Sequence, residues 1–223
     1  MAAQRSRRRA GARVRRILET LRRLYPEVDC ALDFEDPFQL LVATILSAQC
    51  TDVTVNKVTP ALFRCYPDPR RMAEARLEDL EELVYSTGFY RNKARNLKAM
   101  SRKLREDFGG KVPERMEDLL SLPGVARKTA NVVLGMAFRK AEGIVVDTHV
   151  GRIARRLGMT GEKNPVVVER DLTAQVPRED WIWFSHALIE HGRRICRSRK
   201  PLCGECPLAG DCEAARPGGA EAE

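Results

Sequence analysis

Four of the seven cysteines lie in one short segment late in the chain, whereas the other three are scattered. The four follow the spacing C-x6-C-x2-C-x5-C, and such a short wrap of thiolates can enclose one soft metal centre. Zinc and a four-iron cluster both take four cysteines, and a single wrap without two separated C-x2-C pairs favours the cluster. The pattern indicates a metal site and a reducing compartment rather than a disulfide framework. The predicted ligands are Cys196, Cys203, Cys206 and Cys212.

Basic residues are interleaved with these cysteines. The loop between Cys196 and Cys203 carries Arg197, Arg199 and Lys200. These side chains can neutralise an anionic cluster, or they can project outward and contact the phosphates of a nucleic acid. We favour the phosphate role.

A second candidate site is the run LPGVARKTAN, which begins at Leu122 and places a Pro-Gly turn between two short helical patterns. Gly124 allows a tight turn and a close approach of another molecule. The helix that follows offers backbone N–H groups and the positive end of its dipole, which together bind phosphate without reading base sequence. The alternative is an ordinary helix–helix connection. The predicted DNA contacts are Pro123, Gly124, Val125, Ala126, Arg127 and Thr129.

Lys128 lies in the first turn of this second helix, where the dipole and Arg127 both disfavour a cation. If its side chain were also buried, Lys128 would supply a neutral amine, a nucleophile that can attack a sugar carbon. The alternative is a surface lysine that contacts phosphate. This stretch alone favours that alternative.

The run VVDTH supplies a possible partner for the lysine. Asp147 follows an apolar connector and precedes a helical pattern, so we expect it to cap the helix. The same carboxylate could stabilise the positive charge that develops on a deoxyribose as its base departs. His149 is either a DNA contact or a residue of the capped turn.

The rest of the chain reads almost throughout at helical period and predicts an all-α protein of about ten helices. Gly143 to Val146 is expected to be an extended buried connector rather than a strand. The expected helices are Val14–Leu24, Phe38–Leu46, Val53–Tyr66, Leu77–Val84, Asn92–Phe108, Arg115–Ser121, Ala126–Phe138, Thr148–Leu157, Pro165–Gln175 and Arg178–Arg193.

The formal net charge of +8 indicates a polyanionic partner, and nucleic acid fits better than a membrane. The longest apolar run, Leu40 to Leu46, is too short to span a bilayer. The Arg-rich start, Met1 to Arg16, has no apolar core and is not a secretory signal. It is either a basic tail that adds DNA affinity, which we favour, or an organellar transit sequence. We expect disorder at residues 1–12 and 214–223.

Several of these runs together resemble one known family. LPGVARKTANVVL, the VDTH that follows it and the four-cysteine spacing resemble the endonuclease III branch of the helix–hairpin–helix DNA glycosylases. LLVATILSAQCTDVTVNK and TGFYRNKARNL are also similar to this family, and the resemblance runs in order from about residue 14 to Cys212.

The resemblance implies a two-domain helix–hairpin–helix glycosylase fold with a C-terminal iron–sulfur cluster loop. A six-helix domain would span residues 30–140, and residues 1–29 and 141–223 would form the domain that holds a [4Fe-4S] cluster. The protein would act as a monomer on double-stranded DNA that contains damaged bases or abasic sites. A cytoplasmic, nucleoid-associated bacterial enzyme is expected, and an organellar or nuclear location stays open.

The implied activity is base-excision repair of oxidised pyrimidines, with strand nicking by AP lyase chemistry. Lys128 matches the family's nucleophile, which forms a Schiff base with the sugar, and Asp147 matches its catalytic carboxylate. Gln49 matches the residue that fills the gap left by the flipped nucleotide. Phe89 lies where the family places an apolar wedge on the opposite strand. Read without the family, these two residues would be a polar helix end and a core aromatic.

Two departures from the family pattern bear on the site. Ala126 replaces a glycine of the hairpin, which is tolerable only if the φ angle there is not positive. Thr87 and Phe89 are less typical of the wedge loop, which bears on lesion and opposite-base preference.

Two other functions are considered. Adenine and mismatched-thymine glycosylases share the cluster but generally lack an amine at the position of Lys128. A DNA-binding module with a structural or redox-sensing metal would need neither Lys128 nor Asp147.

Overall fold

The computed structural model describes residues 2–216, together with the side chains from residue 11 onward. The parts of the expected disordered ends at residues 1 and 217–223 lie outside the described residues. Residues 2–216 contain helices and connecting loops but no strand, so the expected all-α class is confirmed. No helix in this part of the chain is both long and apolar enough to cross a membrane.

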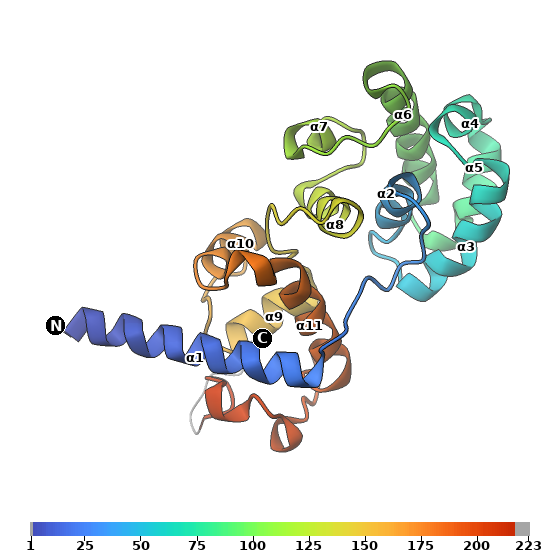
Figure 1. The fold of residues 1–223 in the computed structure, drawn as a ribbon. Helices are drawn as coiled ribbons and strands as arrows, with labels where there is room; N and C mark the ends of the chain where they lie inside the picture. Colours follow the sequence, from blue (N-terminus) through green and yellow to red (C-terminus); the bar gives the residue numbers. More distant parts are fainter. Residues whose placement is uncertain (1, 217–223) are drawn as a thin grey trace. The chain divides into compact units, whose positions relative to one another are not determined.

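Contacts divide the chain into two units, Cys30–Glu142 and Met1–Asp29 with Gly143–Glu223. The domains proposed from the sequence span residues 30–140, and 1–29 with 141–223. The order of the elements along the chain can be followed in Figure 1.

The central unit, Cys30–Glu142, is organised around α2, a helix with eight of its ten residues buried. Helix α2 packs against α3, α6 and α8, and α6 also packs against α4 and α5. Seven α-helices are present in place of the six expected, and the short α4 is the additional one. Their bounds are α2 Pro37–Leu46, α3 Asp52–Cys65, α4 Pro69–Glu74, α5 Leu77–Val84, α6 Tyr90–Phe108, α7 Met116–Leu120 and α8 Arg127–Phe138, with a 3-10 turn η1 at Tyr85–Thr87.

Two Asp-Pro pairs start helices in this unit. Asp36 and Asp68 each accept a hydrogen bond from the backbone N–H three residues later, at 2.8 Å, and a proline follows in the first turn. Capping by Asp and a proline at the first helical position both favour a helix start. A helix at Phe38–Leu46 was predicted, whereas the helix at Pro69–Glu74 was not.

The other unit combines the start and the late part of the chain. Its elements are α1 Ala2–Leu24, α9 Thr148–Arg156, α10 Pro165–Thr173, η2 Arg178–Asp180, α11 Trp181–Arg194, η3 Cys203–Glu205 and η4 Ala209–Asp211. In place of a disordered tail through residue 12, helix α1 begins at Ala2, in a stretch of alanine and arginine with high helix propensity.

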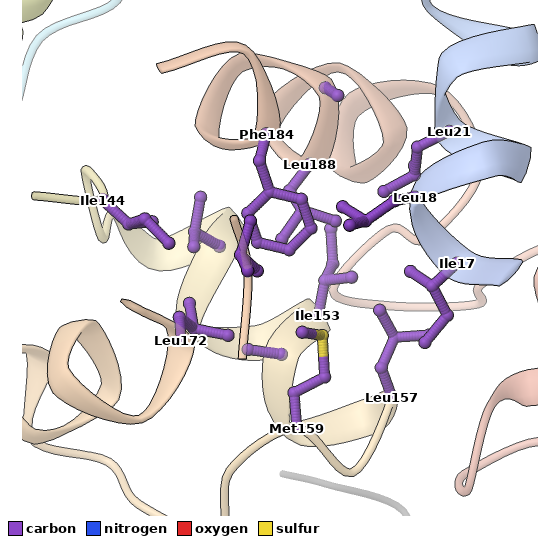
Figure 2. Packing of buried hydrophobic residues seen from close by; sticks show 14 of the residues in the cluster. Ile17, Leu18, Leu21, Ile144, Ile153, Leu157, Met159, Leu172, Phe184 and Leu188 are labelled. Atoms are coloured by element: carbon purple, nitrogen blue, oxygen red, sulfur yellow. The ribbon is translucent and has the colours of Figure 1, made fainter. Parts of the chain in front are cut away.

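The core of this unit lies between α1, α9 and α11. Figure 2 shows Leu18 and Leu21 of α1 facing Phe184 and Leu188 of α11, with Ile153 of α9 below them. Phe184 and Leu188 are fully buried. Burial of each such side chain contributes roughly 1.5–3 kcal/mol. The apolar stripe predicted for Val14–Leu24 is therefore the face that packs in the core.

Ion pairs tie α1 to the end of the four-cysteine segment, and hydrogen bonds tie it to the residues that follow α9. Arg13 donates to the carbonyl oxygens of Leu157 (3.0 Å) and Gly158 (2.8 Å) and to Glu213 (2.7 Å). Arg16 pairs with Asp211 at 2.6 Å. The four-cysteine segment is thus fastened to a helix nearly 200 residues earlier, at a sequence separation of 195.

Candidate functional site

The four candidate cysteine ligands line one cavity of about 390 Å³ in the unit that contains α9 and α11. Side chains from both helices form its wall together with the loop and 3-10 turns that follow α11. None of the four is in a disulfide. Four sulfur donors around a volume much larger than one ion fit a four-iron cluster, in which each iron takes one thiolate.

The electrostatics of the cavity agree with this arrangement. Burial raises the pKa of the Cys206 thiol, and the neighbouring thiols of Cys196, Cys212 and Cys203 add to the effect. Burial also raises the pKa of Cys212, again with contributions from Cys196 and Cys203. The four sulfurs are therefore within electrostatic reach of one another, and a metal must displace protons to bind them.

Three polar groups surround the sulfurs. Arg156 places Nη1 3.4 Å from Sγ of Cys196, and Sγ of Cys212 lies 3.2 Å from the carbonyl oxygen of Arg156. His191, only 1% exposed, has Nε2 3.6 Å from Sγ of Cys206, while its Nδ1 contacts the Tyr25 hydroxyl at 3.1 Å. Such partners orient metal ligands and tune the metal.

The basic loop after Cys196 is held from behind by α9. Arg156 donates to the carbonyl oxygens of Arg197 (2.7 Å) and Ser198 (3.1 Å), and Arg152 donates to that of Cys196 (2.9 Å). The side chains of Arg197, Arg199 and Lys200 are exposed. The arginine that contacts a sulfur is thus on α9, and the basic side chains of the loop point to the surface.

The hairpin turn joins α7 to α8 through Leu122 to Ala126. Gly124 has φ +79°, and a Cβ there would lie 2.9 Å from Cβ of Asn96 on α6. Only glycine fits both the left-handed backbone and the close approach. Val125 is buried and donates its N–H to Leu122, which closes the turn. Pro123 precedes the glycine and is half-buried.

Ala126 settles the question raised by its departure from the family pattern. Its φ is −96° and ψ is 169°, an extended conformation that any residue adopts, so the methyl group costs nothing there. Ala126 is the N-cap of α8, and no side chain caps this helix. An alanine at this position offers no side-chain acceptor to the first N–H groups of α8.

Lys128 and Arg127 are exposed in the first turn of α8, and Thr129 is half-buried. The burial that would by itself favour a neutral amine at Lys128 is therefore not found. The side chain is instead open to a ligand that approaches the end of this helix.

Asp147 is the N-cap of α9, as predicted. Its Oδ1 accepts the N–H of Val150 at 2.8 Å, and its side chain is half-buried. One carboxylate oxygen suffices for the cap. The preceding connector is not a strand, and its Ile144 and Val145 are buried. The N–H of Val145 donates to Oγ of Ser185 on α11 at 3.0 Å. This anchor fixes where the capping carboxylate lies.

His149 is wedged between α9 and α11. Its Nδ1 lies 3.2 Å from Nη2 of Arg152, and a Cβ on Gly192 would approach that Nδ1 to 2.5 Å. Burial lowers the pKa of His149; Asp147 opposes this effect, and Arg152 and Arg193 add to it. The half-buried ring thus sits in a packed pocket close to the capped turn.

Gln49 and Phe89 lie at the tips of two loops of the central unit. Gln49 is exposed with φ 53°, just after α2. Phe89 is 63% exposed with φ 48°, just before α6, so a core role for this aromatic ring is excluded. A left-handed residue other than glycine costs of order 1–3 kcal/mol and persists only where the surroundings impose it.

Sequence reasoning missed three polar residues beside these sites. Lys93 is 4% exposed, and its Nζ donates to the carbonyl oxygens of Leu46 (2.8 Å) and Thr87 (2.7 Å). Burial lowers the pKa of Lys93, and Cys50 opposes this shift. The sequence signal that could have identified Lys93 is its position among the apolar residues on the buried face of α6. Arg156 and His191 were also missed, the latter on the buried face of α11.

Comparisons with known proteins place this geometry in a family. Residues 42–178 match the HhH-GPD superfamily of base excision DNA repair proteins, and residues 196–212 match the iron-sulfur binding domain of endonuclease III. The chain is 56% identical to an endonuclease III from Synechocystis sp., over 92% of this chain and 93% of that one. Its identity to an endonuclease III from Bacillus subtilis is 45%, over 87% and 89% of the two chains.

A solved structure is similar in fold as well. The structure of a trapped endonuclease III–DNA covalent intermediate has a TM-score of 0.88 and 41% identity, and the match covers 92% of this chain and 96% of that one. A thermostable thymine-DNA glycosylase, at 23% identity and a TM-score of 0.80, shares the fold. The chain belongs to the HhH-GPD superfamily of base excision DNA repair proteins, in its endonuclease III branch.

Proposed function

We propose that the protein removes oxidised pyrimidines from duplex DNA and nicks the strand through a Schiff base on Lys128. The protein is a base-excision repair glycosylase with a [4Fe-4S] cluster, and AP lyase activity fits its family. The match to endonuclease III over most of the chain supports this role for Lys128, and the exposed side chain at the start of α8 leaves its amine accessible to a sugar.

The chemistry assigned to Lys128 has two stages. The Nζ of Lys128 attacks C1′ of the sugar, the bond from C1′ to the base breaks, and the base leaves with the bonding electron pair. The sugar ring then opens to an iminium linked to Nζ. Loss of a proton from C2′ expels the 3′ phosphate by β-elimination, and water releases the amine.

Asp147 would stabilise the positive charge that develops on the sugar while its base departs. Its cap to Val150 uses Oδ1, and the anchor between Val145 and Ser185 holds the connector in place. His149 is proposed to contact DNA beside this carboxylate.

Binding is assigned to two phosphate-contacting regions and two inserting side chains. The hairpin, Pro123 to Thr129, and the exposed residues Arg197, Arg199 and Lys200 would contact phosphates. Gln49 would fill the space left by the flipped nucleotide, and Phe89 would wedge against the opposite strand. The exposure of both side chains supports these roles.

Cys196, Cys203, Cys206 and Cys212 are the proposed cluster ligands, and the bound cluster would cross-link the loop rigidly. The protein would act as a monomer in the cytoplasm.

Borohydride trapping tests the proposal. The protein is incubated with a duplex that carries thymine glycol, and base release, strand cleavage and covalent adduct are scored separately. We expect an adduct with the wild-type protein and with Lys140→Gln, a control at the far end of α8 whose Nζ pairs with Glu114. Lys128→Gln should give neither adduct nor base release. Base release at the wild-type rate by Lys128→Gln would show that water is the nucleophile.

A further inference from the structure

The ammonium group of Lys93 is buried between two loops of the central unit. Lys93 lies on the face of α6 that also buries Leu97, Met100 and Leu104. Its Nζ donates to the carbonyl oxygens of Leu46 and Thr87 at 2.8 and 2.7 Å. Burying a lysine is unfavourable unless its N–H groups are bonded, and these two carbonyls bond two of the three.

Both acceptors stand at the base of a loop with a proposed DNA-inserting tip. Leu46 ends α2, three residues before Gln49, and Thr87 ends η1, two residues before Phe89. Each carbonyl lies at the C-terminal end of a helical segment, where free carbonyls and the helix dipole favour a cation. One side chain therefore joins two loops whose acceptors are 47 and 6 residues away from it in sequence.

The backbone of both loops needs such support. Gln49, Gly88 and Phe89 all have positive φ angles, of 53°, 70° and 48°. Thr87 is 1% exposed and donates its hydroxyl to the carbonyl oxygen of Val84, so the second loop is anchored at its base. The Nζ of Lys93 bonds the bases of both loops at once, so removing this side chain removes both of these hydrogen bonds.

We infer that Lys93 is a positioning residue that fixes the separation of Gln49 and Phe89 before DNA is bound. The inference rests on the proposed function, because it takes these two side chains as the ones that enter the duplex. Because both loop tips are already ordered, DNA binding loses less conformational entropy, and Gln49 and Phe89 enter the duplex in one step.

Hydrogen exchange tests the link without DNA. Lys93→Met keeps much of the volume and removes the donors. Lys98→Met is the matched control, since Lys98 lies on the same helix and donates to the carbonyl oxygen of Ala75 at 2.7 Å, at the end of α4. In Lys93→Met, amide exchange should become faster in both loops, residues 47–50 and 86–89. In Lys98→Met, it should stay at the wild-type rate in both. Unchanged exchange at either loop in Lys93→Met overturns the inference.

Kinetics test the consequence for the reaction. Single-turnover base release from a thymine glycol duplex should fall by about tenfold or more in Lys93→Met, since small misplacements cost large factors. Release from the same lesion in a single strand should be unchanged, because there is no stack to fill. Equal losses on both substrates would assign Lys93 a general structural role.

A double-mutant comparison separates this inference from the proposed function. If Lys93 acts through the loop tips, Lys93→Met should cost little more in a protein that already carries Gln49→Ala and Phe89→Ala. If Lys93→Met lowers the rate of base release in that background by as much as it does in the wild-type protein, the positioning role is overturned. If the two loop substitutions leave duplex release at the wild-type rate, insertion itself fails, while hydrogen exchange still decides the link. Should Lys93→Met not fold, Lys93→Gln, which keeps two N–H donors, enters the same comparisons with a smaller expected loss.

Discussion

Gly124 and Ala126 are two residues apart in the hairpin, but Gly124 has a left-handed backbone conformation and Ala126 an extended one. Gly124→Ala should lower the free energy of unfolding by about 1–3 kcal/mol, because φ is positive and the new methyl would press on Asn96. Ala126→Gly should change it by less than about 1 kcal/mol, since the extended conformation suits either residue. Urea unfolding of the two variants checks both values, and equal losses would contradict them.

His149 should make stability depend on pH. Burial lowers its pKa, so the unfolded chain binds more protons than the folded protein just below the ordinary histidine value. The free energy of unfolding therefore falls as pH drops through this window. Wild-type protein should lose more stability than His149→Gln between about pH 7.5 and about pH 5.5. Unfolding can be followed by the fluorescence of Trp181 and Trp183, and equal losses would exclude the effect.

At the scale of elements, periodicity and capping predicted most helices because both are local properties of the chain. Leu77–Val84 was predicted at its observed bounds. Helix α4 was missed because its six residues are too few to show a period, although Asp68-Pro69 repeats the start signal of α2. Helix α1 begins at Ala2 although residues 1–12 were expected to be disordered, because alanine and arginine both favour a helix.

The site residues that could be predicted belong to local sequence patterns, whereas those that were missed depend on partners far away in the sequence. Cysteine spacing, the hairpin turn and the Asp147 cap are each local patterns, the longest of which spans residues 196–212. The family resemblance supplies the proposed roles of Lys128, Gln49 and Phe89. Lys93 and Arg156 could not be assigned, because one acceptor of Lys93 lies 47 residues away and Cys196 lies 40 residues from Arg156. A polar residue on an apolar stripe was the available signal for Lys93.

Arg156 is predicted to hold the basic loop in place. Arg156→Met should free the carbonyls of Arg197 and Ser198 and remove the contact with Cys196. The purified variant should hold less iron and acid-labile sulfide and be cut faster by trypsin in this loop. Arg170→Met, on the surface of α10, is the control. Wild-type iron content and trypsin resistance in Arg156→Met would show that the loop is stable without this brace.

At the scale of the whole molecule, the charge of +8 should make DNA affinity fall steeply with salt. Replacing Arg199 and Lys200 by glutamate should weaken binding to damaged and undamaged duplex alike. The slope of log affinity against log salt should decrease by about 2, one unit for each lost phosphate contact. Fluorescence anisotropy at several salt concentrations measures it.

A charge-matched control comes from the same unit. Lys163→Glu with Arg170→Glu alters two exposed basic residues near α10 and should change the slope less. If the Arg199 and Lys200 variant lost affinity for damaged DNA alone, these residues would be reading the lesion rather than the backbone.

The pairs that fasten α1 to the cysteine segment set an order of events during synthesis. Arg13 and Arg16 are translated 200 and 195 residues before their partners, Glu213 and Asp211. The central unit, Cys30–Glu142, is continuous and can fold while translation proceeds. The unit that contains the cysteines can complete its contacts only after residue 213 has been made, so the central unit can already be folded when the four cysteines become available to a cluster.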